Sequence, residues 1–181
     1  MAMNFGLKNT SGISSNKPLL KPYGIYPVTF SGVETSEFAG KKDPSKKFKV
    51  MRVRFDGKDG YYTETVFFPE TEKDMERMSF DNTDRDGKPY KSYMPSSYDK
   101  AMAIVAQIAA VVNPEGWKKM QEVSDKFTSF ADVANALKKI TDPMKGKFET
   151  NLKLTGRVSN GQLQPTLPNF VRINRDGEAY L

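Results

Sequence analysis

The sequence of 181 residues predicts a β-rich α+β fold, in which a small five-stranded barrel carries a block of helices between its third and fourth strands. Two features of the sequence support this prediction. Alternation of apolar and polar residues, typical of strands, occurs in two separate regions, and helical spacing of apolar residues fills one stretch between them. A parallel sheet needs strands and helices in alternation, so this order excludes one.

The first strand is expected over residues 24–34, in the run GIYPVTFSGVE. Tyr26, Val28 and Phe30 share one face of it, which is the alternation of a half-buried strand. Pro27 lacks a backbone donor, so it favours an edge position or a bulge at that point. A long loop then leads to the second strand.

The second strand, residues 47–55, has apolar residues on both faces unless its backbone is irregular. A bulge near Val50 or Met51 would bring all of them to one side. The same bulge would turn the four cations of the strand to the other side: Lys47, Lys49, Arg52 and Arg54. Two Asp-Gly pairs follow, and they predict a turn and an antiparallel third strand over residues 61–68.

Helices are expected in the middle of the chain, after a polar, turn-rich loop over residues 69–95 that holds at most a short helix. The first runs over residues 96–112 from a serine cap, the second begins at Asn113-Pro114, and the third covers residues 129–140. Together they form a helical insertion at about residues 96–141, which is interpreted as a packing element.

Strand character returns over residues 147–157, and Asn160-Gly161 then predicts a hairpin. The last strand is expected over residues 169–175. Residues 1–18 show no periodicity and are expected to form a flexible N-terminal arm. Residues 19–181 then make up a single domain.

This order of elements fits the OB-fold, a partly open five-stranded barrel. In that fold the ligand lies across strands 2 and 3 and against the loops that join strands 1 to 2 and 4 to 5. In this chain the second strand and the loop before it carry the excess positive charge. That coincidence is the main reason for predicting an OB-like barrel.

The excess positive charge of the chain is confined to residues 41–58. This segment contains eight basic and two acidic residues, a local net charge of +6, and the rest of the chain contains 28 − 8 = 20 basic and 22 − 2 = 20 acidic residues. Cations that follow one loop and one strand, with aromatic rings between them, are what a groove for single-stranded nucleic acid requires. The sequence therefore predicts binding of single-stranded DNA, and it does not rank DNA above RNA.

A set of basic and aromatic residues is predicted to form this site. The cations would neutralise phosphates, while Phe38 and one of Tyr61 and Tyr62 would stack on bases. Most other phenylalanines of the strands, Phe48 and Phe67 among them, are assigned to the core. The full set is Phe38, Lys41, Lys42, Lys46, Lys47, Lys49, Arg52, Arg54, Tyr61, Tyr62 and Arg157. Tyr90, Tyr93 and Tyr98 have two candidate roles: they form a second wall of the groove, or they pack over the barrel.

The composition excludes several kinds of site. Cysteine and histidine are absent, which removes disulfides, thiolate and imidazole catalysis and ordinary zinc sites. Asn82, Asp84 and Asp86 match the first half of an EF-hand loop, but Tyr93 stands where that loop needs a bidentate glutamate. We therefore expect a non-catalytic protein without a metal or other cofactor.

The N-terminal residues contain no apolar segment of the signal-peptide kind. The longest apolar run, residues 101–112, is too short to span a bilayer. We expect a soluble protein of the cytoplasm.

Three segments carry a resemblance to a known family: PYGIYPVTFSGVE, FKVMRVRFDGKDGYYTETVFFP and NLKLTGRVSNGQL. They look like segments of the bacteriophage-type OB-fold single-stranded DNA-binding proteins, and the resemblance covers residues 22–68 and 147–175. It implies a protein that coats transient single strands in phage DNA replication or recombination, in the host cytoplasm. Replication and recombination proteins are the partners it implies. Whether the chain forms an oligomer is left open by the sequence. Such proteins often end in an acidic tail that recruits partners, whereas this chain ends in RINRDGEAYL.

Two other functions remain open from the sequence. The barrel edge and the helix that carries Trp117 could form a structural or protein-interaction module whose basic loop meets an acidic partner. A carboxylate-dependent nuclease is the second, although no acidic cluster recurs on the predicted strands.

Overall fold

The structure, a computed structural model, describes residues 17–168, 172–173 and 179–180. One antiparallel sheet has five strands in the order β3-β2-β1-β6-β7. Its strands are β1 Gly24–Ala39, β2 Lys47–Gly57, β3 Tyr61–Phe67, β6 Glu149–Ser159 and β7 Gln162–Thr166. Two further pairs lie outside this sheet: β4 Met78–Thr83 with β5 Pro89–Met94, and β8 Arg172–Ile173 with β9 Ala179–Tyr180.

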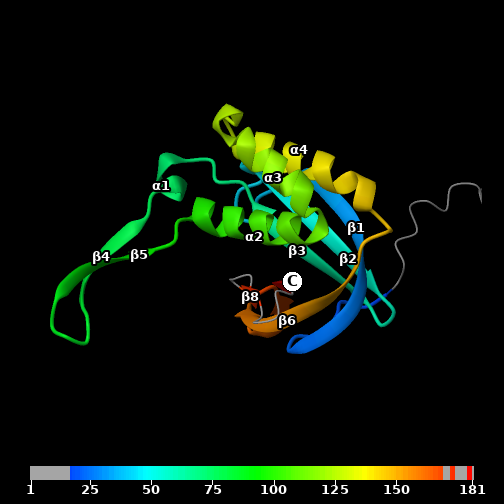
Figure 1. Cartoon of the computed structure of the whole chain (residues 1–181), viewed down its shortest axis with the longest axis horizontal. Helices are drawn as coiled ribbons and strands as arrows, with labels where there is room; N and C mark the ends of the chain where they lie inside the picture. Colours follow the sequence, from blue (N-terminus) through cyan, green and yellow to red (C-terminus); the bar gives the residue numbers. More distant parts are fainter. Residues whose placement is uncertain (1–16, 169–171, 174–178, 181) are drawn as a thin grey trace, which may run out of the picture.

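The main helices lie between β5 and β6 in the chain and gather on one side of the sheet (Figure 1). They are α2 Ser97–Val112, α3 Pro114–Glu122 and α4 Phe130–Thr141. Three single turns complete the helical elements: α1 Glu72–Met75, η2 Ser124–Lys126 and η3 Asp142–Met144. The predicted class, β-rich with helices between the third and fourth strands of the sheet, is confirmed at this level.

The helices begin where their capping side chains stand. Ser96 Oγ accepts a hydrogen bond from Asp99 N at 3.1 Å, and the Asp99 carboxylate accepts one from Ser96 N at 3.0 Å. Ser129 and Asp132 repeat this capping box at the start of α4. Asn113 caps α3 ahead of a proline, as the sequence predicts.

The core lies between the sheet and the apolar faces of α2 and α4. Helix α2 buries Ala101, Val105, Ile108 and Val112, and helix α4 buries Phe130, Val133 and Leu137. Ile104 of α2 and Ile140 of α4 are only half-buried. The sheet contributes Phe30, Val33, Met51, Val53 and Phe55 to the same core.

The bulge predicted in β2 is wrong. Strand β2 pairs with β1 in unbroken register from Lys47 to Arg54, and the irregularity lies in β1 instead, where Ser31 is the extra residue. This bulge turns Phe30 and Val33, three positions apart, to the same core-facing side.

Pro27 does not lie at a sheet edge. It belongs to β1, the central strand, but it precedes Val28, the first residue of β1 that pairs with β2. The missing backbone donor is therefore placed where β1 pairs only with β6.

Regular alternation divides the side chains of β2 between two faces. Met51, Val53 and Phe55 face the core, and Arg52 and Arg54 face the opposite, outer side. Lys47 and Lys49 have the parity of the core-facing residues, so the four cations of the strand do not share one face. The prediction that all four cations face outward is therefore wrong.

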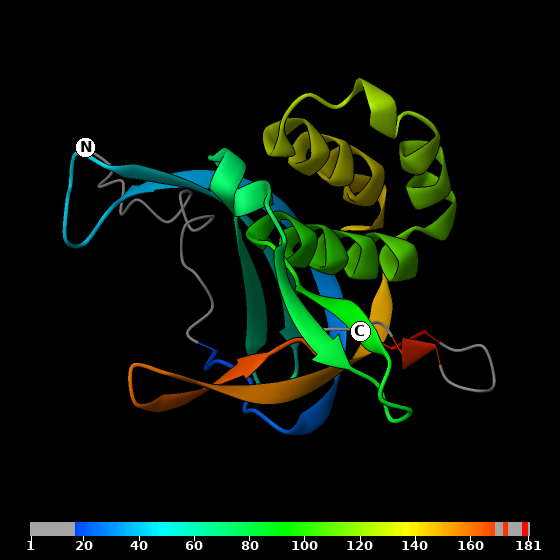
Figure 2. The same ribbon diagram turned by 90° about the vertical axis from the view of Figure 1, so that its left-hand side faces the viewer.

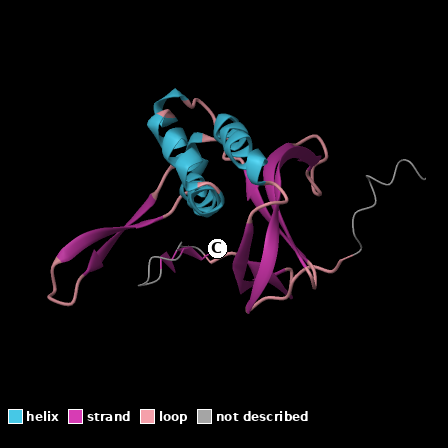
Figure 3. Ribbon diagram, turned by 45° about the vertical axis from the view of Figure 1, so that its right-hand side comes forward, coloured by secondary structure: helices cyan, strands magenta, loops and turns pink. Residues whose placement is uncertain are grey.

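Residues 69–95 are more ordered than the predicted loop. They contain α1 and the β4–β5 hairpin, which projects from the body of the molecule (Figure 3). None of the twelve residues of these two strands is buried. Without a buried face the half-buried alternation that predicts a strand is absent, and the sequence does not reveal this hairpin.

The C-terminal strands also differ from the prediction. Strand β7 follows the Asn160-Gly161 turn directly, and of the predicted strand over residues 169–175 only 172–173 are described. Of the predicted flexible arm, residues 1–16 lie outside the described residues. Among the described residues, none of the helices combines the length and the apolar character that a membrane crossing requires.

The edge strands β3 and β7 are not paired with each other in the described residues, so the sheet is open. A side chain links them instead. Leu167 N, directly after β7, donates a hydrogen bond to Tyr62 Oη of β3 at 3.0 Å. Tyr62 Oη in turn donates to the carboxylate of Glu64.

Replacing Glu64 by glutamine should change how the stability of the fold depends on pH. Burial raises the pKa of Glu64, against the opposing hydrogen bond from Tyr62. The folded state therefore holds this proton more strongly than the unfolded chain, so the wild type loses stability as the pH rises above about 4.5, the ordinary glutamate value. Glutamine cannot ionise. The urea unfolding midpoint of Glu64→Gln should rise relative to that of the wild type between about pH 4.5 and 7. A difference between the two midpoints that stays constant over this pH range would contradict the prediction.

Candidate nucleic-acid interface

Three phenylalanines gather on the outer face of the sheet, near the loop that joins β1 to β2. Phe38 and Phe48 are cross-strand partners whose ring centroids lie 5.7 Å apart with planes inclined by 29°. Phe67 of β3 meets Phe38 edge-on, with centroids 5.9 Å apart. Val50, the cross-strand partner of Phe67, is fully buried. We call Phe38, Phe48 and Phe67 the aromatic cluster.

The rings of the aromatic cluster are accessible to a ligand. Phe67 is 55% exposed and Phe38 37% exposed, while Phe48 between β1 and the loop is half-buried. The exposed parts of the Phe38 and Phe67 rings are flat apolar surface that the fold itself does not bury. This surface is available for stacking against another planar group.

Cations flank the aromatic cluster. Lys46 Nζ lies 5.3 Å from the centroid of the Phe48 ring, within cation–π distance. Arg52 shares the outer face and is exposed. Its cross-strand partner Glu34 does not pair with it, and within the described residues no carboxylate lies within 4.0 Å of either cation.

The loop over residues 40–46 presents further lysines. It is closed by hydrogen bonds from Gly40 N to the Lys46 carbonyl at 2.8 Å and from Lys46 N to the Asp43 carbonyl at 3.2 Å. Hydrogen bonds from Ser45 lower the pKa of Asp43, the single acid of the loop, and occupy its carboxylate. Lys41 and Lys42 are left exposed at the tip of a hairpin that extends away from the helices (Figure 2).

Arg54 lies at the other end of the outer face and is partly neutralised. Its guanidinium donates to Asp56 at 2.8 and 3.0 Å and stands 4.5 Å from the ring centroid of Tyr61. Burial acts to raise the pKa of Asp56, but hydrogen bonds from Arg54 and Ser31 outweigh it, and the pKa is lowered. Tyr61 is half-buried beneath this pair.

The remaining predicted residues are placed apart from the aromatic cluster. Tyr62 is only 2% exposed and offers no face for stacking, so Tyr61 is the remaining candidate of the two tyrosines. Lys49 borders a groove with Phe68 on the helical side. Lys47 is exposed, with the same parity as Lys49. Arg157 is exposed on β6, two strands from β2 in the sheet.

Phe48 and Phe67 lie on the outer face, whereas the sequence assigns them to the core. The parity of β2 contains the missing signal: without a bulge, Phe48 must share a face with Arg52 and Arg54 rather than with Met51. Phe67 follows because antiparallel pairing places it opposite Val50, on that same face.

The site therefore combines rings and cations on one surface of β1, β2 and β3. Within the described ranges, no group of three or more acidic side chains is arranged to hold a metal ion. Comparison of the chain with models of protein families, with curated proteins and with solved structures found no match.

Proposed function

We propose that this chain binds single-stranded DNA across the outer face of β1, β2 and β3, with little sequence specificity and without catalysis. The observation that carries the proposal is the aromatic cluster with its exposed rings beside the unpaired Lys46 and Arg52. Every base has a flat face, so stacking on Phe38 and Phe67 tolerates any sequence. Single-stranded RNA offers the same two chemistries and is an alternative ligand.

The order of groups along the outer face fits an extended single strand of nucleic acid. The loop lysines and Lys46 lie at one end, Arg52 lies in the middle of β2, and Tyr61 with Arg54 lies at the other end. Phosphates would contact the cations while bases lie on the rings. This arrangement retains most of the predicted residues and adds Phe48 and Phe67.

The proposal includes an OB-like, partly open barrel as the fold. Three observations support it: the strand order β3-β2-β1-β6-β7, the helices between β3 and β6, and the hydrogen bond that brings the end of β7 to Tyr62 of β3. The proposed ligand face then coincides with strands 2 and 3 and the first interstrand loop, where OB-folds bind their ligands.

The role that fits this activity is the coating of transient single strands during phage DNA replication or recombination, in the host cytoplasm. It rests on the resemblance of residues 22–68 and 147–175 to phage single-stranded DNA-binding proteins. A protein-interaction module is the second candidate, and the apolar groove between the helices favours it.

Fluorescence anisotropy with an oligothymidine tests the proposal most directly. If about five phosphates are neutralised, the affinity should fall with salt at a log–log slope of about −3.5, at roughly −0.7 per contact on single strands. A duplex of mixed sequence is the control and should bind more weakly, because its bases are not free to stack. Affinity that is indifferent to salt contradicts the proposal, and magnesium-dependent cleavage of the oligonucleotide points to a nuclease.

A further inference from the structure

The β4–β5 hairpin, which we call the arm, has an apolar face that does not belong to the hydrophobic core of the described residues. Met78 pairs with Met94, Phe80 with Ser92 and Asn82 with Tyr90, so these residues share one face. Its large apolar side chains are between 40% and 62% exposed: Met78, Phe80, Tyr90 and Met94. Four such side chains on one face of a two-stranded arm form an unpartnered apolar surface.

The base of the arm is held in place. Arg77, the residue before β4, donates two hydrogen bonds of 2.8 Å to the carboxylate of Asp99 in α2. That carboxylate also closes the capping box with Ser96. Figure 3 shows the arm pointing away from both the helices and the sheet. The arm therefore projects from the molecule with its base bonded to α2, and its apolar face is exposed.

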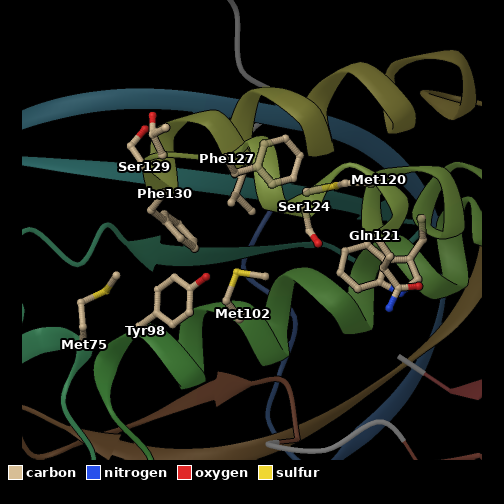
Figure 4. A pocket seen from close by; sticks show the side chains of 12 residues that line it. Met75, Tyr98, Met102, Met120, Gln121, Ser124, Phe127, Ser129 and Phe130 are labelled. Atoms are coloured by element: carbon tan, nitrogen blue, oxygen red, sulfur yellow. The ribbon is translucent and has the colours of Figure 1, made fainter.

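A second apolar feature lies among the helices. A groove of about 160 Å³ opens between α1, α2, α3 and α4. The side chains that border it are largely methionine and aromatic, as Figure 4 shows: Met75, Tyr98, Met102, Met120, Phe127 and Phe130. Methionine adapts its shape to an inserted side chain. We call this surface the helical groove.

Neither surface shares the positive charge of the chain. Residues 76–95 contain four acidic and four basic residues, and residues 114–126, which include α3, contain three of each. Two copies with a net charge of +6 each repel one another least where such neutral surfaces meet. A nucleic acid gains no net attraction from the arm, where Lys91 is already paired with Asp81 at 2.6 Å.

We propose that the arm of one copy docks its apolar face into the helical groove of a second copy. The two surfaces differ, so the contact is head-to-tail and each bound copy still offers a free arm or a free groove. Copies would then join into an open row. The docking itself does not depend on nucleic acid. Only its biological role, the arrangement of copies in a row along single-stranded DNA, rests on the proposed function.

Sedimentation velocity of the full chain without nucleic acid, over a range of concentrations, tests this docking. The arm variant is Met78→Ser with Phe80→Ser, and its matched control is Ser79→Ala with Tyr93→Ser, on the opposite face of the same hairpin. The groove variant is Met75→Glu with Gln121→Glu, two exposed positions that border the groove. It lowers the net charge from +6 to +4, so a loss of association cannot come from added repulsion.

The wild type and the control should self-associate, and the arm and groove variants should each raise the dissociation constant at least about tenfold, as truncation of central apolar contacts does. An equal mixture of the two variants should form dimers and nothing larger, because one intact arm meets one intact groove. Unfolding midpoints close to that of the wild type would show that the variants are folded.

Three results would overturn the proposal. The wild type could be monomeric at every concentration. The groove variant could associate as the wild type does, which would indicate pairing of arm with arm. The arm variant could weaken binding of a short oligothymidine while sedimentation stays unchanged, which would make the arm a wall of the nucleic-acid groove. If the wild type associates but binds no oligonucleotide, the proposed function fails and the docking stands.

Discussion

Replacing Phe38 and Phe67 together by alanine should weaken the binding of an oligothymidine at least about 30-fold. Stacking of a base on an aromatic side chain contributes roughly 1–3 kcal/mol, so the loss of two rings removes about 2 kcal/mol or more. Both rings are partly exposed and their removal opens no enclosed cavity, so the fold should lose little stability. Anisotropy titration gives the affinity, and urea unfolding gives the stability.

Ile25→Ala is a matched control for this pair. Ile25 is also an exposed apolar residue of β1, but it lies beyond the part of the strand that pairs with β2. Its loss should leave the affinity unchanged within twofold or so. If Phe38→Ala with Phe67→Ala binds as tightly as this control, the aromatic cluster is not the stacking surface and the proposed function loses its main support.

The sequence was a reliable guide to elements that have a buried face and a specific cap or turn. Helices α2, α3 and α4 begin at Ser96, Asn113 and Ser129 because each of these side chains accepts a backbone hydrogen bond. The Asn160-Gly161 turn and the Asp-Gly turns before β3 were equally local signals. Such features depend on residues within a few positions of each other.

Features that depend on the partner strand were not predictable in the same way. Apolar residues of both parities in β2 predicted a bulge in that strand, but β2 is regular and carries apolar side chains on both of its faces. The bulge lies in β1 beside Gly32, whose φ of +121° is a backbone conformation that favours glycine. Placing the bulge in β2 instead moved Phe48 to the core and Lys47 and Lys49 to the outer face.

The candidate site keeps its predicted region in the structure, but its members change. The loop lysines, Phe38 and Arg52 lie on or beside one surface, as the concentration of charge indicated. The two additional rings became visible only through the register of β1, β2 and β3. Tyr62 left the site because its hydroxyl bonds to Leu167 and Glu64, residues that no local pattern connects to it.

The register also separates two pairs of cations that the charge count treats alike. Lys46→Glu with Arg52→Glu reverses cations beside the aromatic cluster, whereas Lys47→Glu with Lys49→Glu reverses cations of the opposite parity. Each double variant changes the net charge by four, from +6 to +2, so long-range attraction of a polyanion falls equally in both. Any difference in affinity then reports which face contacts the phosphates.

Lys46→Glu with Arg52→Glu should weaken oligothymidine binding at least about 100-fold, because a hydrogen bond to a charged group contributes roughly 1.5–3 kcal/mol and two are lost. The log–log salt slope should become shallower by about 1.4, at roughly 0.7 for each lost phosphate contact. Lys47→Glu with Lys49→Glu should keep the wild-type slope and lose affinity only through the lower net charge. All four positions are exposed, so the unfolding midpoints should stay close to that of the wild type. Equal losses and equal slopes for the two variants would mean that the strand wraps both faces of the hairpin, and the reverse order would move the binding surface to the helical side.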